Sequence, residues 1–280
     1  MILGIYTNTK RDTNASTCKE LAKIFVAKNI PHMISDTAKD FFVDTQTYSI
    51  SEIAEKCDIV FVLGGDGTML EVVRHTAKKD ALLIGINMGR LGFLTEASKN
   101  ELASVVESVL KGDYTVEKRA MLKATFQKDN KEQTCYALNE IILSSITNVE
   151  VITINIEIDS TTADNIRGDG VMVATPTGST AYSLSCNGPI LSPTVEAFII
   201  NMICPHTLHS TPIVISDNSF VVLKTKNRDT RIIADSQIIS TFDNGACVKI
   251  EKSPYYASFI RLKHENFYHR LLKKLSYWGD

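Results

Sequence analysis

The fold is decided by the stretch Ile59-Val60-Phe61-Val62-Leu63-Gly64-Gly65-Asp66-Gly67-Thr68. Its apolar run predicts a buried strand, and the helical pattern after Thr68 predicts a helix that begins at the glycine turn. Glycines let a turn adopt positive φ angles and let its backbone approach a ligand closely. Because free N–H groups at a helix start bind phosphate, we expect a phosphate-binding turn made of Gly64, Gly65, Gly67 and Thr68.

Asp66 lies inside this turn, where a carboxylate would repel a bound phosphate. It therefore needs another role: to coordinate a metal ion, to accept a proton from a hydroxyl nucleophile, or to cap the helix. The turn lacks the lysine of a Walker loop and the third glycine of a Rossmann fingerprint. The turn alone leaves all three roles open.

A second motif runs from Arg167 to Tyr182. Val171 to Ala174 predicts a short buried strand, a turn follows, and a helix begins near Ser179. Hydroxyl groups crowd this turn, at Thr175, Thr177, Ser179, Thr180 and Tyr182. Such groups can hydrogen-bond sugar, phosphate or base edges without adding charge, and an ordinary Ser/Thr-rich helix cap is the alternative.

The chain resembles the NAD kinase family along most of its length. Four segments carry the resemblance: Gly64–Thr68, Asn87–Leu94, Asn139-Glu140, and Asp169-Gly170 running into Thr175–Tyr182. The first is weakly specific, because lipid kinases share the glycine-aspartate turn, whereas the fourth is highly specific. The family pattern is not followed at Asn187, Thr211 and Ser236. These departures concern the dinucleotide pocket and subunit contacts, and leave the reaction type intact.

The resemblance implies a reaction in which the 2′-hydroxyl of the adenosine ribose of NAD attacks the γ-phosphoryl of ATP. The products would be NADP and ADP, formed in a cleft between two domains. Asp66 would be the catalytic residue that accepts the hydroxyl proton. Mg²⁺, or another divalent cation bound with ATP, would neutralise the phosphates together with the turn amides, without a separate protein metal site. Polyphosphate stays open as an alternative donor.

The resemblance also places a dinucleotide pocket in the second domain. An amide and a carboxylate, Asn139 and Glu140, follow a strand-like segment, where they can bind ribose hydroxyls or base edges. The family pattern adds Asp169, Thr180, Ala181, Tyr182 and Asp235. The ring of Tyr182 would stack on a base. Arg167 would pair with the pyrophosphate or the new 2′-phosphate, or would be a solvated surface arginine.

The sequence pattern changes from the first part of the chain to the second. Alternating strands and helices in the first hundred residues predict a doubly wound, mostly parallel sheet, and strand-like segments from about Tyr114 predict a larger antiparallel β domain. The fold class is thus α/β plus all-β. An amphipathic pattern from Asn266 to Trp278 predicts a C-terminal helix that returns to the first domain. The expected domains are 1–100 completed by 264–280, and 101–263.

Local patterns give four further expectations. Ala38 to Tyr48 lacks a clear period and predicts a loop, and Asp129-Asn130-Lys131 predicts another. Asn244-Gly245 is a typical hairpin turn. The apolar Phe198-Ile199-Ile200 is interpreted either as part of a buried helix or as an oligomer interface.

Composition agrees with an enzyme of this kind. The net charge of −2 gives no general attraction to nucleic acid or to anionic membranes. The longest apolar stretches are strand-length, so no membrane span is predicted. The cysteines occur singly, without a Cys-x-x-Cys pair, and indicate reduced thiols rather than zinc ligands. We expect a cytoplasmic protein that assembles, like its family, as a homodimer or homotetramer.

Two rival functions remain open. A lipid kinase of the diacylglycerol or sphingosine type would reuse the glycine-aspartate turn, but it would need an apolar acceptor pocket or a membrane-facing surface, and not the hydroxyl-rich second motif. A catalytically silent NAD-binding sensor would keep the pocket, and the presence of both Asp66 and Glu140 argues against it.

Overall fold

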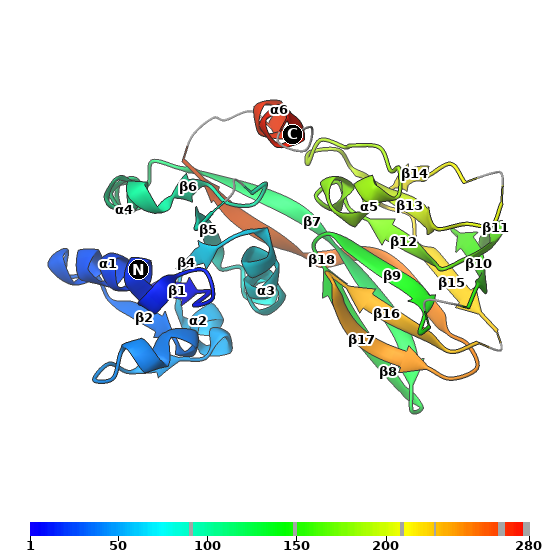
Figure 1. Cartoon of the computed structure of the whole chain (residues 1–280), viewed down its shortest axis with the longest axis horizontal. Coiled ribbons are helices and arrows are strands. Elements are labelled where there is room, and N and C mark those ends of the chain that lie inside the picture. The colour runs from blue at the N-terminus through cyan, green and yellow to red at the C-terminus, as the bar shows by residue number, and fades with distance from the viewer. Residues whose placement is uncertain (90–91, 148–149, 208–209, 227, 263–266, 277–280) are drawn as a thin grey trace. The chain divides into compact units, whose positions relative to one another are not determined.

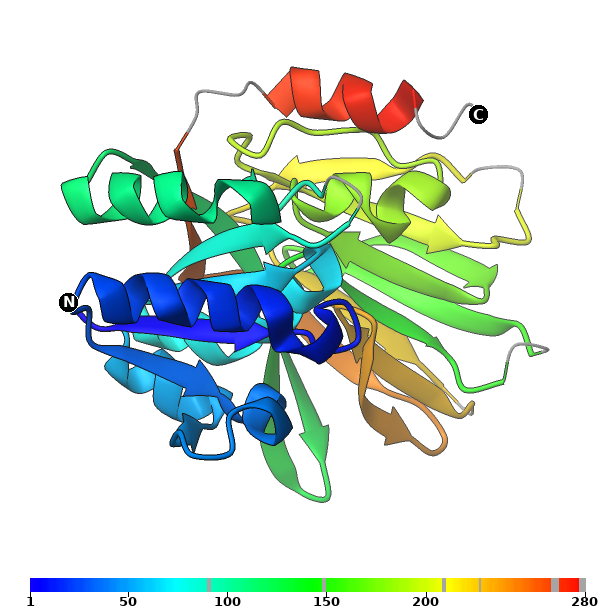
Figure 2. The same ribbon diagram turned by 60° about the vertical axis from the view of Figure 1, so that its left-hand side comes forward.

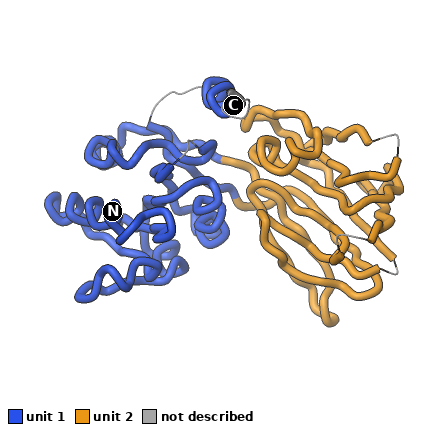
Figure 3. Tube along the Cα trace, in the orientation of Figure 1, with its two compact units in different colours: residues 1–118, 256–280 blue, residues 119–255 orange. Residues whose placement is uncertain are grey.

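The computed structural model describes residues 1–89, 92–147, 150–207, 210–226, 228–262 and 267–276 (Figure 1). The chain divides into two compact units, residues 1–118 with 256–280 and residues 119–255 (Figure 3). Residues 101–118, expected in the second domain, lie in unit 1. The division into domains 1–100 with 264–280, and 101–263, stays a prediction.

Unit 1 contains a parallel sheet with a Rossmann-like strand order. The strands run in the order β3 (Thr47–Tyr48), β2 (His32–Ser35), β1 (Leu3–Thr7), β4 (Ile59–Gly64) and β5 (Leu82–Asn87). The C-terminal part of β18 (Cys247–Arg261) and the short β6 (Ala97–Ser98) also pair with β5 in parallel. Chain order reverses between β1 and β4, and ligands bind outside the carboxyl ends of strands at such a switch point.

Helices cover both faces of this sheet. Helix α1 (Ser16–Ala27) contacts α4 (Leu102–Lys111), and their apolar stripes pack on alternate strand residues such as Ile5 and Phe61 (Figure 2). Helix α2 (Ile50–Lys56) contacts α3 (Asp66–Thr76). The other strand residues face this second pair, and Gly4 leaves room for Ile53 of α2. Because both faces are buried, the strands read as continuous apolar runs.

Unit 2 is built from two antiparallel sheets. One contains β14 (Ile213–Ser216), β13 (Ala197–Ile203), β12 (Gly170–Ala174), β9 (Glu140–Ser145), β16 (Thr230–Ala234) and β17 (Gln237–Phe242), in that order. The other contains β11 (Thr161–Gly168), β10 (Ile152–Ile158), β15 (Val221–Thr225), the N-terminal part of β18, and the hairpin of β7 (Thr115–Lys128) and β8 (Lys131–Ala137).

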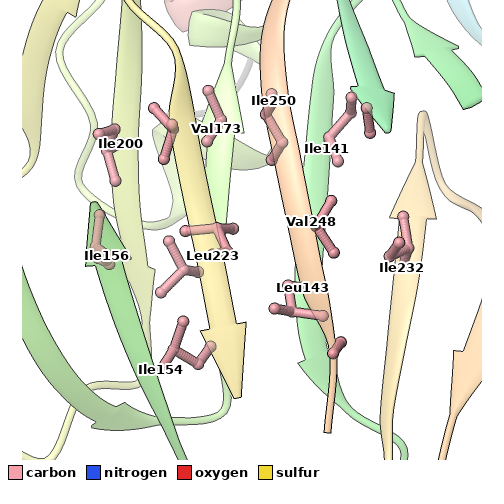
Figure 4. Close-up of a cluster of buried hydrophobic side chains, with 14 of the residues drawn as sticks. Ile141, Leu143, Ile154, Ile156, Val173, Ile200, Leu223, Ile232, Val248 and Ile250 are labelled. Carbon is pink, nitrogen blue, oxygen red and sulfur yellow. The ribbon is translucent and has the colours of Figure 1, made fainter. Parts of the chain in front are cut away.

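The core of unit 2 lies between these sheets (Figure 4). Ile141 and Val173 project from the six-stranded sheet, and Leu223 and Val248 project from the opposite one. All four side chains are buried. Since burying one such side chain contributes about 1.5–3 kcal/mol, this layer dominates the stability of the unit.

The parallel and antiparallel sheets confirm the predicted fold class. Of the local predictions, some are confirmed and others are wrong. Phe198 to Ile200 lies in the fully buried strand β13, so the helix interpretation was wrong. Asn244-Gly245 joins β17 to β18, which pair with different strands, so it is not a hairpin turn. Asp129 and Asn130 take positive φ in the β7–β8 hairpin, which confirms a turn there.

The segment expected as a loop, Ala38 to Tyr48, instead contributes to a 3-10 helix, Asp36–Phe41, and to β3. Strands β11 and β17 were missed because their residues are largely polar and exposed. Each pairs with the strand just before it in the chain, β11 with β10 and β17 with β16. None of the helices in the described ranges is long and apolar enough to cross a membrane.

Helix α6 (Phe267–Ser276) docks on unit 1 through a buried ionic network. The guanidinium of Arg270 donates to the carboxylate of Glu96 at 2.8 Å and to the carbonyl of Thr95 at 3.1 Å. Arg261 also donates to Glu96 at 3.1 Å. The predicted helix ends, Asn266 and 277–278, lie outside the described residues, as does the side chain of Leu275. Leu272, expected on the packed face, is 64% exposed.

We expect Glu96→Gln to lower the free energy of unfolding by about 3–5 kcal/mol, because it removes the buried carboxylate that pairs with the buried Arg270 and is shared with the partly buried Arg261. Glu55→Gln is the control, since Glu55 pairs with Lys79 at the surface and its loss should cost about 0–1 kcal/mol. Urea denaturation followed by circular dichroism measures both. Equal losses in the two variants would contradict the structural role of the network.

Candidate active site

The candidate site of unit 1 lies at the sheet's switch point. The loop after β1 and the glycine turn after β4 leave the carboxyl ends of adjacent parallel strands. The amide of Asn8 donates to the carbonyl of Leu63 at 3.0 Å, and the Asn8 side chain donates to Thr68 Oγ1 at 3.1 Å. The two loops are therefore fixed to one another at the place where α/β folds bind ligands.

The glycines of the turn provide space rather than unusual backbone angles. A Cβ on Gly64 would lie 2.4 Å from Thr68 Oγ1, because the threonine folds back over the turn. A Cβ on Gly67 would meet nothing within 4 Å, so that side is open to a ligand. None of the three takes positive φ, which corrects the expectation from the sequence. Helix α3 begins at this turn, where the Thr68 amide donates to the Gly65 carbonyl at 3.0 Å. Helix starts commonly bind phosphate, and phosphate binding at this turn stays a prediction.

Asp66 does not cap α3, because it is the first helical residue and the cap position belongs to Gly65. Its Oδ2 accepts the amide of Phe93 at 2.9 Å, and its Oδ1 accepts the amide of Leu94 at 3.0 Å. A Cβ on Gly92 would stand only 2.1 Å from Oδ1. This explains the glycine in the Asn87–Leu94 motif, of which residues 90 and 91 lie outside the described ranges. The Asp66 side chain is 31% exposed.

Arg11 places a cation at the glycine turn, and the sequence motifs did not identify it. Its Nη1 lies 3.2 Å from where a Cβ on Gly65 would stand and 3.8 Å from that of Gly89. Buried Asp12 fixes the loop by accepting the amides of Thr17 and Cys18 at 2.9 and 3.0 Å. The sequence contains no sign of this contact, because no local pattern links residue 11 to residue 65.

In unit 2, backbone contacts join the second motif to Asn139-Glu140. The amide of Thr175 donates to the carbonyl of Asn139 at 2.8 Å, and Thr175 Oγ1 donates to the carbonyl of Leu138 at 2.6 Å. A Cβ on Gly178 would lie 2.1 Å from the Asn139 carbonyl oxygen, so only glycine fits. Two segments that are 35 residues apart in the chain are thereby held in one place.

Asp235, in the turn after β16, also contacts this segment. Its carboxylate accepts the amides of Leu138, Asn139 and Glu140 at 2.8, 2.7 and 3.3 Å. The residue is buried and takes φ of +45°. The carboxylate therefore orients the backbone of Asn139 and Glu140, whereas the sequence had suggested that it lines the pocket. Direct binding by Asp235 stays a prediction.

Glu140 is the chemically unusual residue of unit 2. Its side chain is buried, and its Oε2 has no hydrogen-bond partner within the described part of the chain. Burial, followed by the charge of Asp235, raises the pKa of Glu140 from 4.5 to about 8. At neutral pH a protonated carboxyl both donates and accepts a hydrogen bond, which matches the two capacities of a hydroxyl group.

Most hydroxyls of the second motif are used within the protein. Thr177 accepts from the buried Arg119 at 3.2 Å, and Ser179 accepts the amide of Leu191 at 3.0 Å. Thr180 donates to the carbonyl of Thr177 at 3.3 Å. These residues, like Thr175, hold the turn in shape, which was the alternative interpretation of the motif. Ala181 is half-buried, and its methyl side chain cannot form a hydrogen bond.

Tyr182 and Asp169 instead face an open space. Both line a cavity of about 340 Å³, together with Ser144, Ser145, Thr147 and Arg231. The Tyr182 side chain is 44% exposed. Arg167 is exposed, and its carbonyl accepts the amide of His206 at 2.7 Å. Its guanidinium is not among the groups that line this cavity.

Two family models match the chain. The ATP-NAD kinase N-terminal domain matches residues 3–114, and the ATP-NAD kinase C-terminal domain matches residues 138–262. An NAD kinase from Natranaerobius thermophilus is 34% identical over 279 residues, which cover 98% of this chain and 97% of that relative. The matches therefore span both units.

Solved structures agree with this similarity. An NAD kinase from Archaeoglobus fulgidus, in complex with ATP, superposes with a TM-score of 0.79 at 27% identity and covers 99% of both chains. The yeast NADH kinase complexed with NADH has a TM-score of 0.90 at 23% identity, covering 98% of this chain and 87% of the yeast chain. This second likeness bears on the fold alone.

We expect the wild-type protein to lose stability as the pH rises from about 4.5 to about 8, because the folded state binds the Glu140 proton more tightly than the unfolded chain. Glu140→Gln removes this titration, so its stability relative to wild type should increase through that window and level off above it. Urea denaturation at several pH values measures the difference. The exposed Glu132→Gln is the control, and a constant difference between Glu140→Gln and wild type would contradict the raised pKa.

Proposed function

The chain belongs to the ATP-NAD kinase family, and on this premise we propose that it transfers the γ-phosphoryl of ATP to the 2′-hydroxyl of the adenosine ribose of NAD. The ribose O–H bond breaks, as does the bond from the γ-phosphorus to the oxygen of ADP. A bond forms between the ribose oxygen and phosphorus, and the products are NADP, ADP and a proton. The observation that carries the proposal is the Asp66 carboxylate, held at a glycine turn at the switch point.

In this proposal, unit 1 binds the triphosphate and supplies the base. The amides of the glycine turn and the guanidinium of Arg11 face the phosphates. Asp66 accepts the hydroxyl proton. A carboxylate is far less basic than a ribose alkoxide, so the proton moves late, and alignment with the γ-phosphoryl matters more than deprotonation. This fits a carboxylate that is fixed by two backbone amides rather than free to rotate.

Unit 2 binds the dinucleotide. Glu140, protonated at neutral pH and lacking a partner at Oε2, pairs with a ribose hydroxyl beside Asn139. Tyr182 and Asp169 present a ring and a carboxylate in the adjoining cavity. The exposed Arg167 pairs with the pyrophosphate or with the new 2′-phosphate in this proposal. The proposal requires that both units act on the same NAD molecule.

A divalent cation, Mg²⁺ in the simplest case, accompanies ATP in this proposal. The described residues contain no group of three or more His, Cys, Asp or Glu side chains that could hold a metal ion. Mg²⁺ commonly keeps substrate phosphates and water among its ligands, so the ATP phosphates would hold it here without a separate protein metal site. When bound, the ion neutralises phosphate charge. Polyphosphate would meet the same groups.

We further propose a cytoplasmic homodimer or homotetramer. The edges of the six-stranded sheet, β14 and β17, carry the exposed apolar residues Val214 and Ile238. Edge strands with apolar side chains are ready to pair with another chain. A second copy of this chain is the partner in the proposal.

The two alternatives predict different results. A lipid kinase has no use for a buried, protonated glutamate with an unpaired oxygen, and lipid phosphorylation in mixed vesicles would be required to revive it. An NAD-binding sensor would bind NAD without turnover. Purified protein with Mg-ATP and NAD, coupled to an NADP-specific dehydrogenase, separates these functions. Polyphosphate can replace ATP in a parallel reaction, and no signal above a control without enzyme would overturn the proposed function.

We expect Asp66→Asn to lower turnover by roughly 100-fold or more, the usual scale for loss of a general base. The affinity for NAD, measured by calorimetry, should stay within a few-fold, because NAD binding rests on unit 2. Circular dichroism and the thermal midpoint check that the fold survives the loss of one acceptor for the Phe93 and Leu94 amides. Turnover near the wild-type rate would remove Asp66 from catalysis.

We expect Tyr182→Ala to weaken NAD binding by about 1–3 kcal/mol, the range measured when an aromatic ring that stacks on a base is removed. The affinity for ATP should change little. Tyr256→Ala is the matched control, because Tyr256 is also exposed and lies outside the cavity. Unchanged NAD affinity in a folded Tyr182→Ala protein would show that the ring does not contact the dinucleotide.

A further inference from the structure

The C-terminal helix reaches the proposed catalytic carboxylate. Lys274 Nζ lies 3.2 Å from Asp66 Oδ2, although the two residues are 208 positions apart in the chain. The same ammonium lies 4.2 Å from the ring centroid of Phe93, which places it in a cation–π contact. Lys274 therefore contacts both the carboxylate and the residue whose amide binds that carboxylate.

The position of Lys274 is fixed by its own helix. Arg270 lies four residues earlier, so its side chain projects from the same face of α6. It is buried and binds Thr95 and Glu96. Phe267 at the start of the helix packs near Phe93, with ring centroids 6.2 Å apart. Three successive turns of α6 thus contact residues 93–96.

Residues 93–96 are the same segment that holds Asp66. The amides of Phe93 and Leu94 donate to the two carboxylate oxygens, and Gly92 permits the close approach. The helix therefore supports Asp66 twice: through the segment that binds it and through the Lys274 ammonium. Together, two amides and one ammonium determine where the remaining lone pairs of the carboxylate point.

We propose that Lys274 is a positioning residue for phosphoryl transfer, acting through Asp66; this rests on the proposed function. It holds the carboxylate in the orientation that accepts the ribose proton. The Lys274 and Asp66 side chains are partly covered, with 21% and 31% of their surface exposed. The effect of this contact should appear in turnover, where a shift of about 1 Å in a reacting group can cost roughly 100-fold.

The test compares Lys274→Met with Lys273→Met, which removes the same charge from the neighbouring exposed position of α6. We expect Lys274→Met to lower kcat by roughly 10- to 100-fold, while KM for NAD and for ATP stays within about 3-fold. Lys273→Met should keep the wild-type kcat. Lys274→Arg retains a cation that can reach Asp66 and should restore much of the rate.

A double-mutant cycle separates positioning from general support. If Lys274 acts through Asp66, adding Lys274→Met to Asp66→Asn should lower the residual turnover by no more than about 2-fold, because the two changes remove one shared interaction. Equal losses in both backgrounds would overturn the proposal. A wild-type kcat in Lys274→Met would also overturn it, provided that the wild-type protein phosphorylates NAD.

A readout independent of activity keeps this inference distinct from the proposed function. In ¹⁵N spectra, Lys274→Met should shift the amide resonances of Phe93 and Leu94, and Lys273→Met should leave them in place. Unchanged resonances in Lys274→Met would overturn the contact even in an active enzyme. Shifted resonances in a protein without NAD kinase activity would keep the contact and reject the function.

Discussion

The structure of unit 1 depends on the close approach of the Asp66 carboxylate to the backbone of residues 92–94. Only a residue without a Cβ fits at Gly92, because a Cβ there would lie 2.1 Å from Asp66 Oδ1. This one contact joins the turn after β4 to the segment after β5, and that segment is in turn bound by α6 through Arg270. The glycine turn, the 92–94 segment and the C-terminal helix therefore form a single site, since moving one of them displaces the others.

Much of the fold could be predicted because its signals are local. The strand at residues 59–63 is buried on both faces, so its sequence is apolar without alternation, and the glycines mark where it ends. The Gly64–Thr68 and Asp169–Tyr182 motifs also concern neighbours in sequence. The helix interpretation of Phe198 to Ile200 was wrong because no local signal decides it. A fully buried strand and a buried helix have the same apolar composition, and only the pairing with β12 and β14 distinguishes them.

The parts of the site that the sequence did not reveal are contacts between distant residues. Arg11 reaches Gly65 because β1 and β4 are neighbours in the sheet, and Lys274 reaches Asp66 because a buried ionic network docks α6. Neither residue belongs to a motif. Conversely, some conspicuous residues of the sequence serve the structure. Thr175, Thr177 and Ser179 of the hydroxyl-rich turn form hydrogen bonds within the protein.

The two units use carboxylates in opposite ways, and their surroundings explain why. Asp235 accepts three backbone amides, so its charge is satisfied inside the protein. That buried charge faces Glu140, whose pKa is raised to about 8 by burial and then by Asp235. Burial, reinforced by the charge of Asp235, thus keeps Glu140 protonated at neutral pH, and a protonated carboxyl is suited to bind a sugar hydroxyl and not to remove its proton. In the proposed function, Asp66, which is partly exposed and held by two amides and an ammonium, is the carboxylate that accepts the proton.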